Sequence, residues 1–311
     1  MTESHPARAI AVRPIRANGA RSNAPTGWAR WALSAPLLMF LTLFAVIPVF
    51  YGVWVSLTDQ RVLSRSVQFV GFQNYRTVLS DKAFWQSLWF TLWYTVVTTG
   101  FVLVTGFFLA LLVNRRFPGK RVLITALLLP IMIAPALMGL MFRLALNSNT
   151  GVIPAFLNFV GLHVSLFDPH AVAPLLVLLE VAQWTPFTFV ILYAALQAMP
   201  SEVLEAAQLD GADRWQTLRH IVLPLMAPAL FAAGFLRAVD ALRTFDVIYV
   251  LTGGGPGTVT TTLSIYVYKQ AFTNGSFAVA ETAAVLTMVI VVPLVPVIIG
   301  RVVAQPGSRP K

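Results

Sequence analysis

The sequence predicts an all-α membrane protein, a polytopic bundle of six transmembrane helices whose two termini both lie in the cytoplasm. Two observations predict this fold. Of the 311 residues, 57% are hydrophobic and only 11% are charged, whereas soluble domains carry roughly 25% charged residues. The charged residues also gather in short segments between long apolar runs, which is the arrangement of a chain that crosses a bilayer repeatedly.

Six apolar runs are long enough to cross a membrane. They cover residues 33–57, 88–113, 122–146, 171–196, 228–251 and 278–300. A helix needs about 20 residues to cross roughly 30 Å of hydrocarbon, so each run suffices. A membrane β-barrel would show short strands of alternating polarity, but these runs are apolar on every face, and this pattern excludes strands.

The lysines and arginines of the connecting segments predict the orientation. Fourteen lie in the N-terminal tail, the second and fourth connections and the C-terminal tail, and five lie in the other connections. The positive-inside rule therefore places both termini in the cytoplasm. We expect a disordered basic tail over residues 1–30, a six-helix domain over residues 31–301 and a short cytoplasmic tail over residues 302–311.

Composition also excludes several classes of function. The chain has no cysteine, which excludes disulfides, thiolate metal sites and a cysteine nucleophile. The four histidines His5, His163, His170 and His220 are scattered, so neither a metal site nor an enzyme's catalytic constellation is expected. Membrane orientation explains the net charge of +10, so we expect no nucleic-acid partner.

The connection between the fourth and fifth runs, residues 197–225, is the most informative polar segment. Ser201 and Glu202, which follow Pro200, are typical of a helix start. Gly211 can adopt a positive φ and reverse the chain, and a second short helix is expected from residue 212 or 213 to residue 223. Two short helices about a glycine would form a cytoplasmic docking projection, and the alternative is a helix that lies on the membrane surface.

This segment resembles the EAA loop of permease subunits in binding-protein-dependent ABC importers, in which EAA is followed after three positions by G and after nine more by I-x-L-P. The matching residues and their neighbours are Glu205, Ala206, Ala207, Asp210, Gly211, Ala212, Ile221, Leu223 and Pro224. Residues 245–257, FDVIYVLTGGGPG, and residues 69–75, FVGFQNY, are similar to carbohydrate importers of the maltose type. The resemblance covers residues 30–300 and implies the type I ABC importer permease fold.

The resemblance also implies a function and a set of partners. A permease of this family translocates a sugar or related polyhydroxylated solute across the bacterial cytoplasmic membrane, beside a second homologous permease and membrane lipid. An extracytoplasmic binding protein delivers the solute, and two cytoplasmic ATPases bind ATP and Mg. The chain lacks G-x-x-x-x-G-K-[ST], so we expect it to bind no cofactor. An ion-coupled secondary transporter of a small polar solute is the alternative.

Ionisable residues within the predicted spans mark a candidate solute pathway, because a charge at bilayer depth costs at least about 2.5 kcal/mol. The candidates, with one neighbouring aromatic residue, are Glu180, Trp184, Arg237, Asp240, Arg243 and Asp246. The four charges of the fifth run recur every three residues, which predicts a slanted stripe of opposite-charge pairs on one helix. These pairs either hold helices together or hydrogen-bond sugar hydroxyls beside an aromatic ring.

Overall fold

The computed structural model describes residues 27–64, 66–115, 117–161 and 165–293. Within these ranges the chain is helical, and the only β pairing is an isolated bridge between Thr58 and Phe69. The all-α prediction is therefore confirmed for the described residues. The chain divides into two compact units, Met1–Phe50 and Tyr51–Lys311. The first contains α1 (Gly27–Leu41), the π-helical turn η1 (Thr42–Val46) and the start of α2 (Ile47–Ser56).

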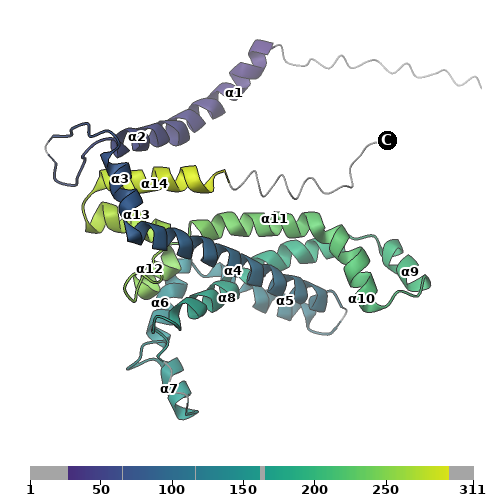
Figure 1. The fold of residues 1–311 in the computed structure, drawn as a ribbon. Coiled ribbons are helices and arrows are strands. Elements are labelled where there is room, and N and C mark those ends of the chain that lie inside the picture. The colour runs from purple at the N-terminus through teal and green to yellow at the C-terminus, as the bar shows by residue number, and fades with distance from the viewer. Residues whose placement is uncertain (1–26, 65, 116, 162–164, 294–311) are drawn as a thin grey trace, which may run out of the picture. The chain divides into compact units, whose positions relative to one another are not determined.

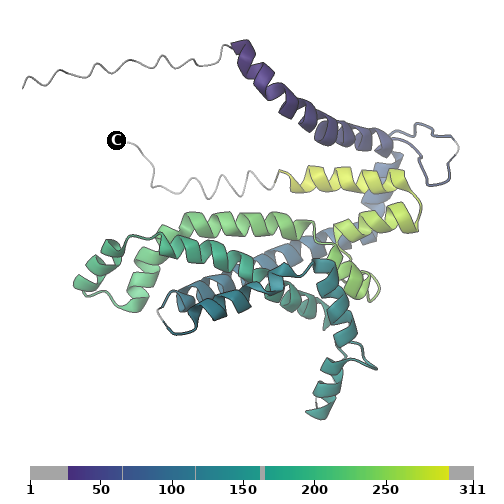
Figure 2. The same cartoon turned by 180° about the vertical axis from the view of Figure 1, so that it is seen from behind.

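The second unit holds the helical bundle. Its long helices α4 (Lys82–Val113), α8 (Val172–Gln197) and α11 (Leu223–Leu242) pack against one another pairwise, and they lie side by side in both ribbon views (Figure 1 and Figure 2). The shorter elements are α3 (Gln73–Ser80), α5 (Lys120–Leu128), η2 (Pro130–Met132), α6 (Pro135–Ala145), α7 (Val152–Phe159), α9 (Ser201–Leu209), α10 (Arg214–Thr217), η3 (Leu218–Val222), α12 (Asp246–Thr252), α13 (Leu263–Tyr268), η4 (Lys269–Thr273) and α14 (Phe277–Val291).

Small residues and hydroxyl groups bring α4 and α8 into close contact. A methyl group at Gly106 would lie only 2.2 Å from Thr188 Oγ1, so this position requires glycine. Thr188 Oγ1 donates a hydrogen bond to the carbonyl of Val102 (2.9 Å), and the hydroxyls of Thr105 and Thr185 lie 2.8 Å apart. Close packing of small residues and interhelical hydrogen bonds are how helices associate in lipid, where the hydrophobic effect does not drive association.

Four helical stretches of the described residues are long and apolar enough to cross a membrane, and a bent pair of helices makes up to five spans. They are Ser34–Ser56, Lys82–Val113, Val172–Gln197 and Arg214–Leu242, with the bent pair Lys120–Met132 and Pro135–Ala145. The sixth predicted run begins with α14, and its last residues, 294–300, lie outside the described residues. So do residues 1–26 and 302–311 of the predicted tails, together with His5 and His163.

The predicted bounds of two runs are wrong. The third run, expected as one helix over residues 122–146, bends by 92° at extended residues Ile133 and Ala134. Pro135 disfavours helical geometry in the residue before it, which explains the break. The fifth run, expected over residues 228–251, is instead a helix over Arg214–Leu242 followed by a separate α12.

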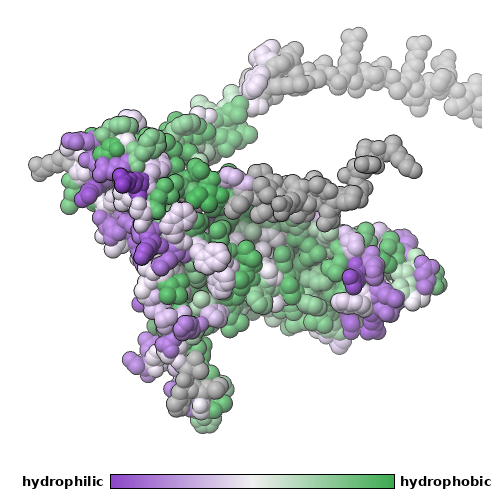
Figure 3. Space-filling view, in the orientation of Figure 1, coloured by the Kyte–Doolittle hydropathy of each residue, from purple (hydrophilic) through white to green (hydrophobic). Residues whose placement is uncertain are grey.

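The surface of the bundle changes polarity along its length. Hydrophobic residues cover the middle of the bundle, while hydrophilic residues gather around α9 and α10 at one end and around α3 at the other (Figure 3). An apolar middle between two polar ends is the distribution expected of helices that cross a bilayer.

Candidate functional site

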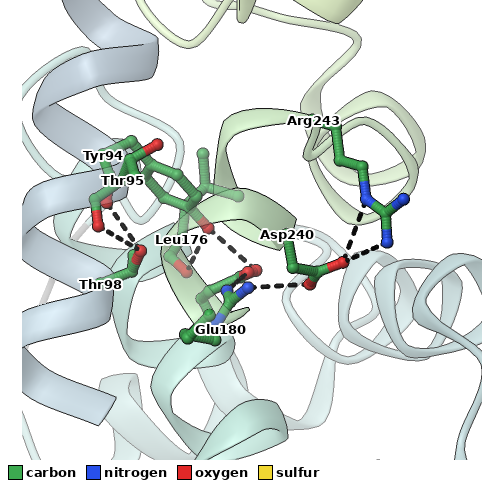
Figure 4. Close-up of polar contacts among 8 residues, drawn as sticks. Tyr94, Thr95, Thr98, Leu176, Glu180, Asp240 and Arg243 are labelled. Atoms are coloured by element: carbon green, nitrogen blue, oxygen red, sulfur yellow. Dashed lines mark hydrogen bonds and ion pairs between the residues drawn. The ribbon is translucent and has the colours of Figure 1, made fainter. Parts of the chain in front are cut away.

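A buried network of charged side chains joins α4, α8 and α11. Arg237 on α11 forms an ion pair with Glu180 on α8, and each residue is only 1% exposed. Arg237 Nη1 also donates to Asp240 Oδ2 (2.8 Å), one helical turn further along. From α4, the hydroxyl of Tyr94 donates to Glu180 Oε2 (3.1 Å), and the dashed lines of Figure 4 follow these contacts. One guanidinium thus pairs with two carboxylates, and the buried charge of Glu180 has a counter-charge, as buried charges require.

An aromatic ring and a second arginine extend this network. The guanidinium of Arg237 lies over the ring of Trp184, 4.8 Å from its centroid, in a cation–π arrangement. Arg243 donates from Nη2 (3.0 Å) and Nε (3.3 Å) to Asp240 Oδ1. The Arg243 side chain is 77% exposed, so Asp240 bridges one buried and one exposed arginine.

A cavity of about 270 Å³ opens beside this network. Its lining residues are Pro135, Glu180, Trp184, Asp240, Arg243, Thr244, Phe245, Asp246 and Val247. Five of the six predicted pathway residues therefore line one space, and the sixth, Arg237, contacts three of them. The volume is near the lower end of ligand pockets. Carboxylates, a guanidinium and an indole ring are groups that can hydrogen-bond hydroxyls and contact an apolar ring face.

The predicted stripe along one helix is wrong beyond Asp240. Arg243 caps the end of α11, and Asp246 begins α12 after a break in the helix. The carbonyl of Thr244 accepts a hydrogen bond from the hydroxyl of Thr262 (3.1 Å), so it is satisfied without helical pairing. The break allows Asp246 to line the same cavity as Asp240.

Sequence reasoning missed Tyr94. This tyrosine lies inside the second apolar run and is fully buried, where it is indistinguishable from an ordinary core aromatic residue. Only its position opposite Glu180 assigns its hydroxyl to the charge network. The predicted neighbour Trp184 was identifiable because it follows Glu180 by one helical turn.

The predicted turn of residues 197–225 is present. Gly211 adopts a φ of 76° between α9 and α10, which strongly favours glycine. Asp213 caps the next helix: its Oδ1 accepts from Gln216 N (2.7 Å), while Gln216 Oε1 accepts from Asp213 N (2.9 Å). The expectation of a short second helix is wrong, because Arg214 begins the continuous helix that ends at Leu242. The reason is that Val222, Leu223 and Met226 continue the helical packing into the bundle.

The residues of the EAA-like motif have different environments. Glu205, Ala206, Asp210, Gly211 and Pro224 are exposed, Ala212, Ile221 and Leu223 are half-buried, and Ala207 is buried. The Ala207 carbonyl accepts from Ala212 N (3.0 Å), so the backbone at Ala207 closes the turn of the loop. Leu209 and Trp215 are exposed at the same projection, 89% and 66% respectively, and they add apolar area to its surface.

The helical bundle, its intramembrane charge network and its projecting loop define a membrane transport component. Residues 102–305 match the family described as the binding-protein-dependent transport system inner membrane component. The chain belongs to this family, which confirms the resemblance found in the sequence. Its relatives are transport components and not enzymes.

Two relatives and one solved structure illustrate the similarity. The trehalose/maltose transport system permease protein MalF of Thermococcus litoralis is 34% identical over 258 residues, 82% of this chain and 87% of the relative. The sn-glycerol-3-phosphate transport system permease protein UgpA of Escherichia coli is 34% identical over 273 residues, 86% and 91%. A bacterial ABC transporter involved in the import of the acidic polysaccharide alginate matches with a TM-score of 0.78 and 22% identity over 90% of this chain and 96% of that chain, which shows the same fold.

Proposed function

We propose that the chain is a pore-forming permease subunit of an ATP-driven ABC importer for a sugar or related polyhydroxylated solute. The observation that carries this proposal is the similarity, over 82% of the chain, to a permease named for trehalose and maltose transport. The ion-coupled secondary transporter considered from the sequence is contradicted by the family match.

The proposed architecture has six spans with both termini in the cytoplasm of a bacterial cell. The four to five spans of the described residues and the cytoplasmic bias of lysine and arginine support it. In this arrangement the bent pair forms the third span and α14 begins the sixth. Residues 1–30 and 302–311 would be cytoplasmic tails around a transmembrane domain of residues 31–301.

The proposed partners are a second homologous permease, two cytoplasmic ABC ATPases, an extracytoplasmic binding protein and membrane lipid. The family description, a component of binding-protein-dependent transport, supports this set. ATP and Mg would bind the ATPases, because this chain lacks a phosphate-binding loop. The loop of residues 197–225 would contact one ATPase, with Glu205 as its charged anchor and Gly211 at its turn.

One long helix can transmit movement from that loop to the cavity. Arg214, directly after the loop's turn, and Asp240, in the cavity wall, lie on the same continuous helix. When ATP closes the ATPase pair, a displaced loop would carry this helix and alter the cavity. Glu180, Trp184 and the other cavity-lining candidates would contact the solute, while Arg237 would hold their carboxylates in place.

Transport itself is tested with the complete importer in proteoliposomes. We expect uptake of labelled sugars or polyols that requires both ATP and the binding protein and is insensitive to proton ionophores. Uptake that is driven by an ion gradient without ATP would overturn the proposal.

The coupling role of the loop is tested with a matched pair of glycine variants. Gly211→Val should retain insertion and assembly but uncouple ATP hydrolysis from uptake, because a β-branched residue strains the left-handed turn by at least about 1 kcal/mol. Gly119→Val is the control, since Gly119 has a similar φ of 82°, equally open surroundings and a place in another connection. Normal uptake per ATP hydrolysed in Gly211→Val would contradict the coupling role.

A further inference from the structure

We propose that the cavity beside α8, α11 and α12 admits uncharged solutes and disfavours anionic ones. This inference rests on the proposed function and narrows its solute to a neutral sugar or polyol, as opposed to a uronic acid or a sugar phosphate. Relatives of this chain are named for neutral and for anionic solutes alike, so similarity alone leaves the charge of the solute open.

Acidic groups outnumber basic groups at the cavity. Glu180, Asp240 and Asp246 line it, whereas Arg243 is the single basic residue of the lining. Arg237 adds one further positive charge through its ion pairs with Glu180 and Asp240. The count is three carboxylates to two guanidinium groups, which leaves one negative charge in excess among these residues.

Both arginines are already bound to carboxylates. Arg237 is buried between Glu180 and Asp240, and Arg243 directs two N–H groups to one oxygen of Asp240. An anionic solute could bind either guanidinium only by displacing a carboxylate. Among the described residues Asp246 forms no ion pair, so its charge is the uncompensated one.

The same groups suit a neutral polyhydroxylated solute. A carboxylate accepts hydrogen bonds from hydroxyl groups but repels a second anion. Pro135, Phe245 and Val247 supply apolar wall, which lowers the local dielectric constant and strengthens the repulsion. Asp246 is exposed to solvent, so one uncompensated charge at about 6 Å should disfavour a monovalent anion by roughly threefold to a hundredfold, for effective dielectric constants between about 80 and 20.

The electrostatic potential of the cavity can be measured without knowing the solute. The chain contains no cysteine, so Thr244→Cys places a single thiol of this subunit in the cavity wall. The complete importer, held in lipid nanodiscs, is treated with a cationic and an anionic methanethiosulfonate reagent of similar size. Mass measurement of this subunit gives the two labelling rates, and Ser148→Cys in the exposed connection before α7 serves as the control.

We expect the ratio of cationic to anionic labelling rates to be at least about tenfold higher for Thr244→Cys than for Ser148→Cys. Adding Asp246→Asn should lower the ratio by about tenfold. Asp168→Asn, at an exposed acidic residue outside the cavity lining, should leave it unchanged.

Three results would overturn the inference: equal ratios at the two thiols, a ratio insensitive to Asp246→Asn, or no labelling of Thr244→Cys while Ser148→Cys reacts. The labelling uses no sugar and no ATP. An importer without ATP-dependent sugar uptake would therefore refute the proposed function separately from this inference.

Discussion

Replacing Glu180 with glutamine should destabilise the bundle, because the substitution leaves Arg237 buried with one counter-charge fewer. Both residues are only 1% exposed, and Tyr94 donates to the same carboxylate. Glutamine keeps the length and nearly the shape of the side chain, so the lost charge is the main change. The reciprocal variant, Arg237→Gln, leaves the Glu180 carboxylate without its cation.

The expected loss in the free energy of unfolding follows from the burial of the ion pair. Removing one partner of a buried ion pair costs about 3–5 kcal/mol, because the remaining charge is uncompensated. In Glu180→Gln, Arg237 keeps Asp240 at 2.8 Å, but the Asp240 side chain is 29% exposed, so water weakens that pair. We therefore expect a loss of about 3 kcal/mol for Glu180→Gln. The double variant Glu180→Gln, Arg237→Gln should lie within about 1 kcal/mol of the wild type, since it buries no unpaired charge.

The experiment measures the free energy of unfolding in mixed micelles for the wild type, both single variants and the double variant. These four values give the coupling energy of the pair. Glu281→Gln makes the same chemical change at a half-buried residue of α14 that forms no ion pair among the described residues, and it should have a small effect. A Glu180→Gln variant as stable as the wild type, or a double variant as unstable as the summed singles, would refute the reasoning.

Three further perturbations test the packing between α4 and α8, the capping of the long helix and the α13 end of the bundle. Gly106→Ala should lower the free energy of unfolding by about 1–3 kcal/mol, because the added methyl group overpacks against α8. The control Gly100→Ala has open space on the same helix and should be neutral or stabilising. Equal unfolding free energies for the two variants would contradict this. Asp213→Ala should cost about 1 kcal/mol and speed amide exchange at the start of the long helix, while Asp213→Ser should not. Burial and the hydrogen bond to Asp81 (2.7 Å) raise the pKa of Tyr266. The stability that the Tyr266 hydroxyl gives the folded protein should therefore be complete below pH about 10 and decline above it. A melting-temperature difference between the wild type and Tyr266→Phe that is the same at pH 11 as at neutral pH would argue against this.

Local sequence signals predicted the elements whose geometry is decided locally. The apolar runs identified the long helices, because continuous apolar faces of that length fit a bilayer. The turn at Gly211 was predictable because a reversal of this kind favours the residue without a Cβ. The bend of the third run was not predicted, although Pro135 is a local signal for it, because proline disfavours helix in the residue before it. The helix break after Leu242 had no such signal, because it depends on a contact outside its own segment: the carbonyl of Thr244 accepts a hydrogen bond from Thr262, 18 residues further along the chain.

The same distinction between local and non-local signals explains which residues of the candidate site could be predicted. Charge at membrane depth identified Glu180, Arg237 and Asp240, since intramembrane charges are costly enough to require a reason. Their grouping with Asp246 around one cavity depended on the helix break and was not visible in the three-residue spacing. Tyr94 was invisible for a different reason: a hydroxyl on a buried aromatic ring carries no sequence signal until its partner is known.

The energies of the ion pairs indicate which parts of the subunit can move during transport. Separating α8 from α11 while both side chains stay buried would leave Glu180 and Arg237 unpaired, and one uncompensated buried charge already costs about 3–5 kcal/mol. The pair of Asp240 with the exposed Arg243 can open at a cost of about 0–1 kcal/mol. A displacement of the loop of residues 197–225 should therefore move α8 and α11 together. The cavity would then change on the side of Arg243, where the helix is already broken and where the hydrogen bonds between Arg243 and Asp240 are exposed to water.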